Sequence, residues 1–161
     1  MVIVIMGVAG SGKTTIGRAL ATALAWSFRD ADEFHPPANV AKMSAGQPLT
    51  DADRAPWLAA IRAFVDEKIA RGENSVVTCS ALKEKYRAQL IGGSASVKLV
   101  HLAGGAALLA SRLAGRADHF MKPAMLASQL AALEPPADAL TVDIAQSPDR
   151  IVAQIRRAFS P

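Results

Sequence analysis

Residues 7–14 read GVAGSGKT, and this stretch decides the fold because of what lies on either side of it. The apolar, β-branched run at residues 2–6 is typical of a strand buried on both faces. After the glycines, Ile16, Leu20 and Leu24 recur every four residues, as on one face of a helix. Strand, glycine-rich turn and helix open a βαβ unit, and the turn fits the nucleotide-binding pattern G-x-x-x-x-G-K-[ST].

The phosphate loop, as we call residues 7–14, has a clear physical role. Its glycines let backbone N–H groups turn inward, and the helix N-terminus adds positive potential where phosphates would lie. Lys13 is expected to reach the β- and γ-phosphates and to act in catalysis, and the Thr14 hydroxyl is expected on Mg²⁺. The predicted nucleotide-binding residues here are Gly7, Ala9, Gly10, Ser11, Gly12, Lys13, Thr14 and Thr15.

The rest of the chain alternates short apolar runs with helical patterns. Further strands are predicted at residues 26–29, 76–79, 97–102 and 140–144. This alternation predicts a three-layer α/β fold, a five-stranded parallel sheet flanked by helices, as in P-loop NTPases. The length of 161 residues suits a single domain over residues 1–161.

Two helix starts carry capping signals. The TDAD stretch at residues 50–53 resembles a capping box, so capping is favoured over catalysis for Asp51 and Asp53. Ser147 is a candidate N-cap with Pro148 at the first helical position. The turn at residues 145–148 follows the fifth predicted strand.

Composition and charge exclude several classes of protein. The 18 Lys and Arg against 14 Asp and Glu give a net charge of +4 that is not gathered in one block, which argues against a nucleic-acid tail. The single cysteine, Cys79, excludes an intramolecular disulfide and a zinc pattern and is expected to be a small buried hydrophobe. No apolar stretch approaches the roughly 18 residues of a membrane span. We therefore expect a soluble, cytoplasmic protein without nucleic-acid or membrane partners.

The chain lacks the marks of other nucleotide-binding classes. A GTPase is expected to carry N-K-x-D, which is absent, and a motor ATPase usually ends a strand on Asp, whereas VVTCS ends on Cys79 and Ser80. A small kinase remains, and its reaction needs an acceptor site, an orienting carboxylate and cations near the transferred group.

Residues 30–37, DADEFHPP, are the candidate acceptor stretch. They follow the second predicted strand, and ligands of such sheets bind beyond the carboxyl ends of the strands. If the chain stays extended there, Asp30 and Asp32 project to one side while Glu33 points into solvent. One carboxylate would take the acceptor proton and the other would help to hold hydrated Mg²⁺.

Three further segments resemble one known family. DADEFHPPANVAKMSAGQPLTDADRAPWL (30–58), CSALKEKYRAQL (79–90) and HFMKPAMLASQLAALEPP (119–136) resemble the gluconate kinases, small P-loop kinases related to shikimate and nucleoside monophosphate kinases. The resemblance implies phosphorylation of D-gluconate at its 6-hydroxyl with ATP and Mg²⁺, and commonly a homodimer. In many family members Y-R-x-x-L is followed by Arg, whereas Ile91 stands here.

The resemblance also implies roles for individual residues. Asp32 would be the base, with Asp30 as runner-up and as the indirect contact to magnesium. His35 would donate to a sugar hydroxyl, with capping of the next helix as the alternative. The predicted substrate-binding residues are Asp32, His35, Lys42, Arg54, Ser80, Lys83 and Arg87. Among the cations Arg54 and Arg87 are favoured, because a guanidinium suits a carboxylate substrate.

Other positions in these segments have competing interpretations. Ser80 is expected to cap the helix after the third strand or to contact substrate, and Lys83 is expected one turn into that helix. Trp57 fits a core position better than a wall of the site.

A lid is expected at about residues 116–124. Arg112 and Arg116 are four residues apart, hence on one helical face, and the resemblance brings both to the transferring phosphoryl group. The alternative for them is complementing the dipole of a helix C-terminus. His119 is given no role. In related kinases adenine packs at the turn that here includes Pro148.

Two rival functions stay open beside gluconate phosphorylation. A kinase for another hydroxy acid, such as shikimate, is expected to show a G-G-G turn after the third strand, where this chain has CSALK. A non-catalytic ATP-binding regulator would need neither the acceptor carboxylate nor the lid arginines.

Overall fold

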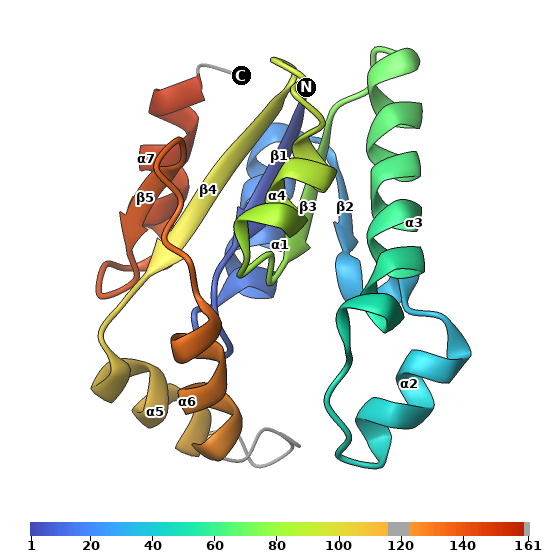
Figure 1. The fold of residues 1–161 in the computed structure, drawn as a ribbon. Helices are drawn as coiled ribbons and strands as arrows, with labels where there is room; N and C mark the ends of the chain where they lie inside the picture. The colour runs from blue at the N-terminus through green and yellow to red at the C-terminus, as the bar shows by residue number, and fades with distance from the viewer. Residues whose placement is uncertain (116–122, 160–161) are drawn as a thin grey trace.

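The computed structural model describes residues 1–115 and 123–159. Five parallel strands form one sheet in the order β2-β3-β1-β4-β5 (Figure 1). The strands are β1 (Val2–Met6), β2 (Ser27–Asp30), β3 (Ser75–Cys79), β4 (Val97–Ala103) and β5 (Leu140–Asp143). The predicted strands are confirmed with boundary shifts of one residue, the largest consequence being that β2 includes Asp30.

Helices cover both faces of the sheet. They are α1 (Lys13–Leu24), α2 (Pro37–Ser44), α3 (Asp51–Ala70), α4 (Glu84–Ile91), α5 (Ala106–Ala114), α6 (Pro123–Ala132) and α7 (Pro148–Phe159), with a short 3-10 helix, η1 (Ala31–Phe34). No helix among the described residues is long and apolar enough to cross a membrane.

The two hydrophobic cores follow from the alternation of side chains along each strand. Ile3 and Ile5 pack with α1, α5, α6 and α7 on one face, whereas Val4 and Met6 pack with α3 and α4 on the other. Because β1 is central and covered on both faces, all five of its residues are buried. The predicted three-layer α/β fold is confirmed.

Both capping predictions can be compared with the structure. Thr50 caps α3, accepting from Asp53 N while the Asp53 carboxylate accepts from Thr50 N, so the capping role of Asp53 is confirmed. Asp51 does not cap the helix and instead pairs across the site, as described below. Helix α7 begins at Pro148, as predicted.

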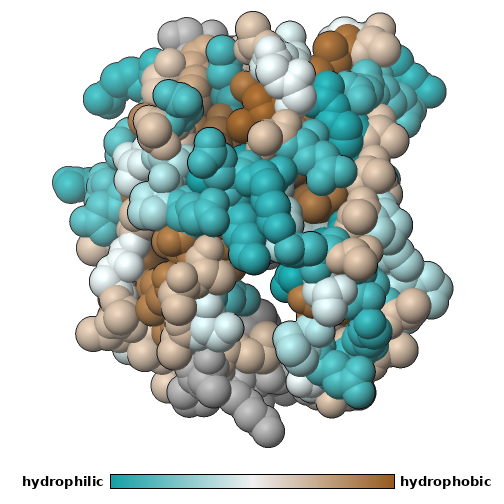
Figure 2. Space-filling model, in the orientation of Figure 1, coloured by the Kyte–Doolittle hydropathy of each residue, from teal (hydrophilic) through white to brown (hydrophobic). Residues whose placement is uncertain are grey.

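The predicted lid at residues 116–124 falls on 116–122, which lie outside the described residues, and on the first two residues of α6. Arg116 and His119 lie in that range. On the described surface, the space-filling view shows a hollow between the side formed by α5 and α6 and the side formed by α2 and α3, with hydrophilic residues above it (Figure 2).

Candidate active site

The phosphate loop joins β1 to α1 in a conformation that requires glycine. Gly12 has a φ of 90° at the N-cap of α1, and Gly7 has a φ of 152°. A Cβ on Gly7 would lie 2.8 Å from Ser11 Oγ and 2.9 Å from Leu102 O. Neither position tolerates a side chain without strain, so the glycines of the motif have a direct structural reason.

Lys13 and Ala9 have partners around the phosphate loop itself. Lys13 Nζ donates to Val8 O at 3.1 Å. Ala9 N donates to Gln129 Oε1 of α6 at 2.7 Å, so a side chain 120 residues away reaches the loop. Gln129 was not predicted from the sequence, and its only signal was its place in a segment resembling the family.

A cavity of about 250 Å³ lies beside the phosphate loop. It brings together six of the predicted nucleotide-binding residues with three that sequence reasoning missed. The predicted ones are Gly10, Ser11, Gly12, Thr15, Arg112 and Pro148, and the missed ones are Ile16, Gln146 and Ile151. The start of α7 and the end of α5 thus meet the phosphate loop, as a nucleotide site beyond the strand ends requires.

Arg112 is held in this cavity by a backbone carbonyl. Its Nη2 donates to Ile144 O, just after β5, at 2.7 Å. A Cβ built on Gly12 would lie 3.8 Å from its Nη1. The guanidinium therefore lies beside the phosphate loop and is not limited to complementing the α5 dipole.

The acceptor stretch meets the phosphate loop through Asp30. Asp30 Oδ2 accepts from Thr14 Oγ1 at 2.9 Å, and its Oδ1 accepts from Asp32 N at 3.2 Å. The expectation of an extended chain through Asp32 is wrong, because η1 begins at Ala31 and Asp30 is its N-cap. The two carboxylates come together through a helical turn and not through strand alternation.

Glu33 completes the cap of η1. Asp30 N donates to Glu33 Oε1 at 3.3 Å, and Glu33 also lies 3.5 Å from Arg29 Nη1. Half of its side chain is exposed, so the solvated position is confirmed, with a capping contact that was not foreseen.

Asp32 carries the electrostatics expected of a base. Its side chain is 87% exposed. Reduced hydration is the largest cause that raises the pKa of Asp32, and the negative charge of Asp30 is the second. His35 and Lys13 oppose the shift. Lys13 thus connects Asp32 electrostatically to the phosphate loop.

His35 lies against the core. Its ring stacks on Trp57 with centroids 4.4 Å apart and planes 9° from parallel. Its Nε2 lies 3.9 Å from Asp32 Oδ1, and its side chain is only 5% exposed. Trp57 is 4% exposed and donates from Nε1 to Ala31 O at 2.7 Å, so the core position expected for it is confirmed and it also anchors η1.

The predicted substrate cations have protein partners. Lys42 Nζ pairs with Asp53 Oδ1 at 2.7 Å. Arg54 donates from Nη1 to Leu49 O, and its guanidinium lies 5.8 Å from the centre of the Tyr86 ring.

Arg87 is the most buried of the predicted cations, at 6% exposed. Its Nη1 donates to Ala81 O at 3.1 Å and to Leu82 O at 2.9 Å, which holds the loop after β3. These bonds give Arg87 a structural role that the sequence did not indicate.

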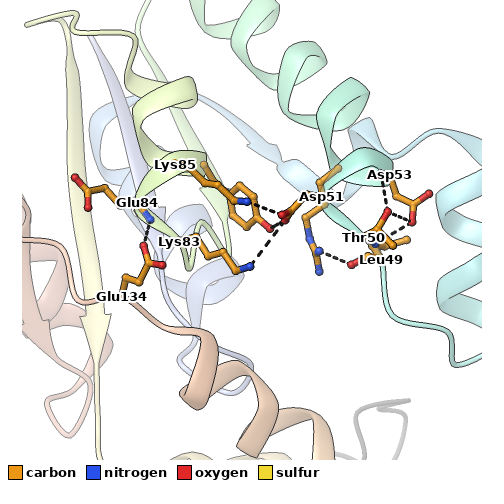
Figure 3. Close-up of polar contacts among 10 residues, drawn as sticks. Leu49, Thr50, Asp51, Asp53, Lys83, Glu84, Lys85 and Glu134 are labelled. Carbon is orange, nitrogen blue, oxygen red and sulfur yellow. Dashed lines mark hydrogen bonds and ion pairs between the residues drawn. The ribbon is translucent and has the colours of Figure 1, made fainter.

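Asp51 is the centre of a polar network between α3 and α4 (Figure 3). Its carboxylate accepts from Lys85 Nζ and from the Tyr86 hydroxyl, and Lys83 Nζ lies 3.9 Å from it. Hydrogen bonds from Lys85 and then Tyr86 lower the pKa of Asp51 to about 2. This network was not predicted, because Asp51 and the α4 residues are more than 30 positions apart.

At the start of α4, the capping alternative for Ser80 and the expected position of Lys83 are wrong. The helix begins at Glu84 with Lys83 as its N-cap, so Ser80 does not cap it and Lys83 does not lie one turn in. Glu84 N instead donates to the carboxylate of Glu134, 50 residues away in the sequence (Figure 3). Cys79 is buried, which confirms the position expected for it, and burial raises its pKa to about 12.

The donor set near the phosphate loop fits Mg²⁺. No cluster of three or more His, Cys, Asp or Glu suited to a metal exists within residues 1–115 and 123–159. Magnesium, however, is usually held by one or two protein oxygens together with substrate phosphates and water. The adjacent Thr14 hydroxyl and Asp30 carboxylate supply such oxygens.

The fold and the site together define a small P-loop kinase. A family model described as an AAA domain matches residues 2–136. A gluconokinase of Gluconobacter oxydans is 48% identical, over 98% of this chain and 90% of the relative. The chain belongs to the gluconokinase family.

Solved structures agree with this assignment. A sugar kinase from Janibacter sp. superposes with a TM-score of 0.88 at 41% identity, covering 97% of this chain and 92% of that chain. A gluconokinase from Sinorhizobium meliloti superposes with a TM-score of 0.82 at 41% identity, covering 98% and 94%. The sequence resemblance to the gluconate kinases is confirmed.

Proposed function

We propose that this protein transfers the γ-phosphoryl group of ATP to the 6-hydroxyl of D-gluconate, giving 6-phospho-D-gluconate and ADP. One observation carries the proposal: the similarity to curated gluconokinases extends over almost the whole chain. The position of Asp30 and Asp32 beside the phosphate loop supports an acceptor site there, and the similarity supports gluconate as the acceptor.

Each partner of the reaction has a place in this proposal. The phosphate loop, with Lys13, binds the phosphates of ATP, and the cavity between Arg112 and Pro148 takes the rest of the nucleotide. Thr14 and Asp30 would hold Mg²⁺, which would supply positive charge to neutralise the transferred group. The acceptor is proposed to bind beside Asp32, where its hydroxyl can face the phosphate loop.

The chemical step uses Asp32 as the base. As the 6-oxygen bonds to the γ-phosphorus, the bond from that phosphorus to the bridging oxygen of ADP breaks, and the hydroxyl proton passes to the Asp32 carboxylate. A raised pKa makes this carboxylate a better proton acceptor than an ordinary aspartate. Lys13, Arg112 and Arg116 are proposed to stabilise the charge on the transferred group.

The substrate carboxylate needs a cation, and the α3–α4 side of the hollow has several. Arg54 belongs to α3, and Lys83 and Arg87 belong to the start and the first turn of α4, whereas Lys42 is paired with Asp53. Arg54 is the favoured partner, because a guanidinium suits a carboxylate and because Arg54 lies beside this network, next to the Tyr86 ring. Ser80 lies on the same loop as the carbonyls held by Arg87. Assembly as a homodimer in the cytoplasm completes the proposal.

A coupled assay tests the function directly. ADP release by the full chain should require both ATP and gluconate, and ³¹P NMR should show a phosphate ester on the 6-oxygen. Shikimate serves as the matched acceptor for the rival kinase. ATP binding without gluconate-dependent ADP release would reject the proposal and favour a non-catalytic ATP-binding role.

A further inference from the structure

The His35 ring has neighbours on three sides, although the residue belongs to a surface stretch. Trp57 stacks on its face, and Asn39 and Asp32 approach its two nitrogens. A side chain that is 5% exposed cannot easily turn or exchange its partners for water. The protonation of each nitrogen is therefore determined by its neighbours.

Asn39 determines which nitrogen of His35 carries the proton. Its amide is buried, at 3% exposed, and its Nδ2 lies 2.8 Å from Asp53 O. A backbone carbonyl only accepts, so the NH₂ group and not the amide oxygen must face it. The second N–H of this group faces His35 Nδ1 at 3.4 Å, and Nδ1 must accept. In the neutral ring the proton is then on Nε2.

The protonated nitrogen faces the proposed base. His35 Nε2 lies 3.9 Å from Asp32 Oδ1. This distance is too long for a hydrogen bond, but the exposed Asp32 side chain is free to rotate toward the packed His35 ring. The ring is the fixed partner of this pair and the carboxylate is the movable one.

We propose that His35 is a positioning residue for phosphoryl transfer: its Nε2–H, fixed by Asn39 and Trp57, holds one oxygen of Asp32 and leaves the other for the acceptor hydroxyl. His35 keeps its proton throughout, and only Asp32 gains one. The inference rests on the proposed function, because it assigns Asp32 to the acceptor of that reaction.

The charges around the ring favour the neutral donor form. Loss of hydration lowers the pKa of His35, Asp32 opposes this shift, and Arg54 on α3 adds to it. The groups that act on Asp32 besides His35 are Asp30 and Lys13. At neutral pH a neutral imidazole donates one hydrogen bond to Asp32 without neutralising its charge.

NMR on the protein labelled with ¹⁵N-histidine tests the tautomer. The chain has three histidines, and His35→Gln identifies the signals of His35 by their loss. Long-range ¹H–¹⁵N spectra at neutral pH should show a protonated Nε2 and an unprotonated Nδ1. A protonated Nδ1, alone or with Nε2, would overturn the inference.

Kinetics of a matched pair of variants test the positioning role. A Gln side chain places its amide nitrogen near the position of Nε2, whereas Asn places its amide near Nδ1. His35→Gln should keep kcat within about threefold, while His35→Asn should lose about 10- to 100-fold in kcat, with KM for gluconate little changed. Equal losses in both variants, or a loss confined to KM, would overturn the inference.

The two hypotheses fail in different ways. Wild-type protein without gluconate-dependent ADP release would reject the proposed function, whatever the tautomer of His35. Active wild-type protein with the wrong tautomer would reject only the positioning role. ATP binding by both variants, measured by calorimetry, shows that the nucleotide site is intact, and the NMR test on wild-type protein does not depend on how the variants fold.

Discussion

Thr14 Oγ1 donates to Asp30 Oδ2 at 2.9 Å, joining the first turn of α1 to the end of β2. The two residues belong to the phosphate loop and the acceptor stretch, and β3 lies between β2 and β1 in the sheet. Their contact bridges that strand at its carboxyl end. A phosphoryl donor on one loop and an acceptor on the other are thereby placed next to each other.

Asp32→Asn should separate catalysis from nucleotide binding. The amide cannot take the acceptor proton, so kcat should fall by roughly 10² to 10⁴ while ATP binding is retained. Asp30→Asn is the matched variant and should mainly raise the Mg²⁺ concentration needed for activity. If Asp30→Asn abolished turnover and Asp32→Asn did not, the two roles would be reversed.

The acid limb of the pH profile should report the raised pKa of Asp32. The base works only when ionised, so kcat/KM falls as pH drops through a pKa above 3.8, the ordinary value for aspartate. Removing the charge of Asp30 should shift this limb to lower pH. An acid limb that did not move in Asp30→Asn would contradict the coupling of the two carboxylates.

Arg112→Met should lower kcat far more than it would if Arg112 only complemented the dipole of α5. Loss of charge stabilisation on the transferred group is expected to lower kcat by roughly 10³, whereas loss of a dipole contact costs less than about 1 kcal/mol. Arg71→Met, at the exposed C-terminus of α3, is the control and should leave kcat unchanged. A small change in kcat for Arg112→Met would show that Arg112 only holds the chain after β5 through its hydrogen bond to Ile144 O.

Trp57→Phe should destabilise the fold because it removes one buried hydrogen bond. The phenyl ring can still stack on His35, but Ala31 O loses its donor, which costs about 1 to 3 kcal/mol. Urea unfolding measures the change in free energy. Trp26→Phe, at a partly buried position of the other core, controls for the change in ring size and should cost less.

Asp51→Asn and Asp53→Asn should lower stability at neutral pH but not in strong acid. Hydrogen bonds from Lys85 to Asp51 and from Lys42 to Asp53 lower each pKa from 3.8 to about 2. A carboxyl group whose pKa is lower in the folded than in the unfolded protein contributes stability at pH values above its unfolded pKa. This contribution is lost as the pH falls from 3.8 toward 2.

Urea unfolding at several pH values measures this difference. The gap between wild type and each variant should close across that acid range. Asp138→Asn, at an exposed loop position, is the control and should follow wild type at every pH. A gap that persisted in strong acid would show that packing, and not ionisation, is the cause.

The sequence was most informative where function depends on local geometry. The phosphate loop was predictable because Gly7 and Gly12 need backbone angles that other residues rarely adopt, and because strand and helix periods flank it. The capping box at Thr50 and Asp53 was predictable for the same reason, since its partners are three residues apart. Recognition of the family came from whole segments whose order and spacing match.

Contacts between distant segments were decided only by the tertiary structure. The turn into η1 after Asp30 is stabilised by Trp57, a residue 26 positions away, so strand alternation could not foretell where Asp32 points. Gln129 reaches Ala9, and Asp51 pairs with Lys85, for equally non-local reasons. The periodicity of the sequence predicts on which face of its own helix or strand a residue lies. Which residue of another element it meets is set by how the helices pack on the sheet, and that packing placed the His35 ring against Trp57 of α3.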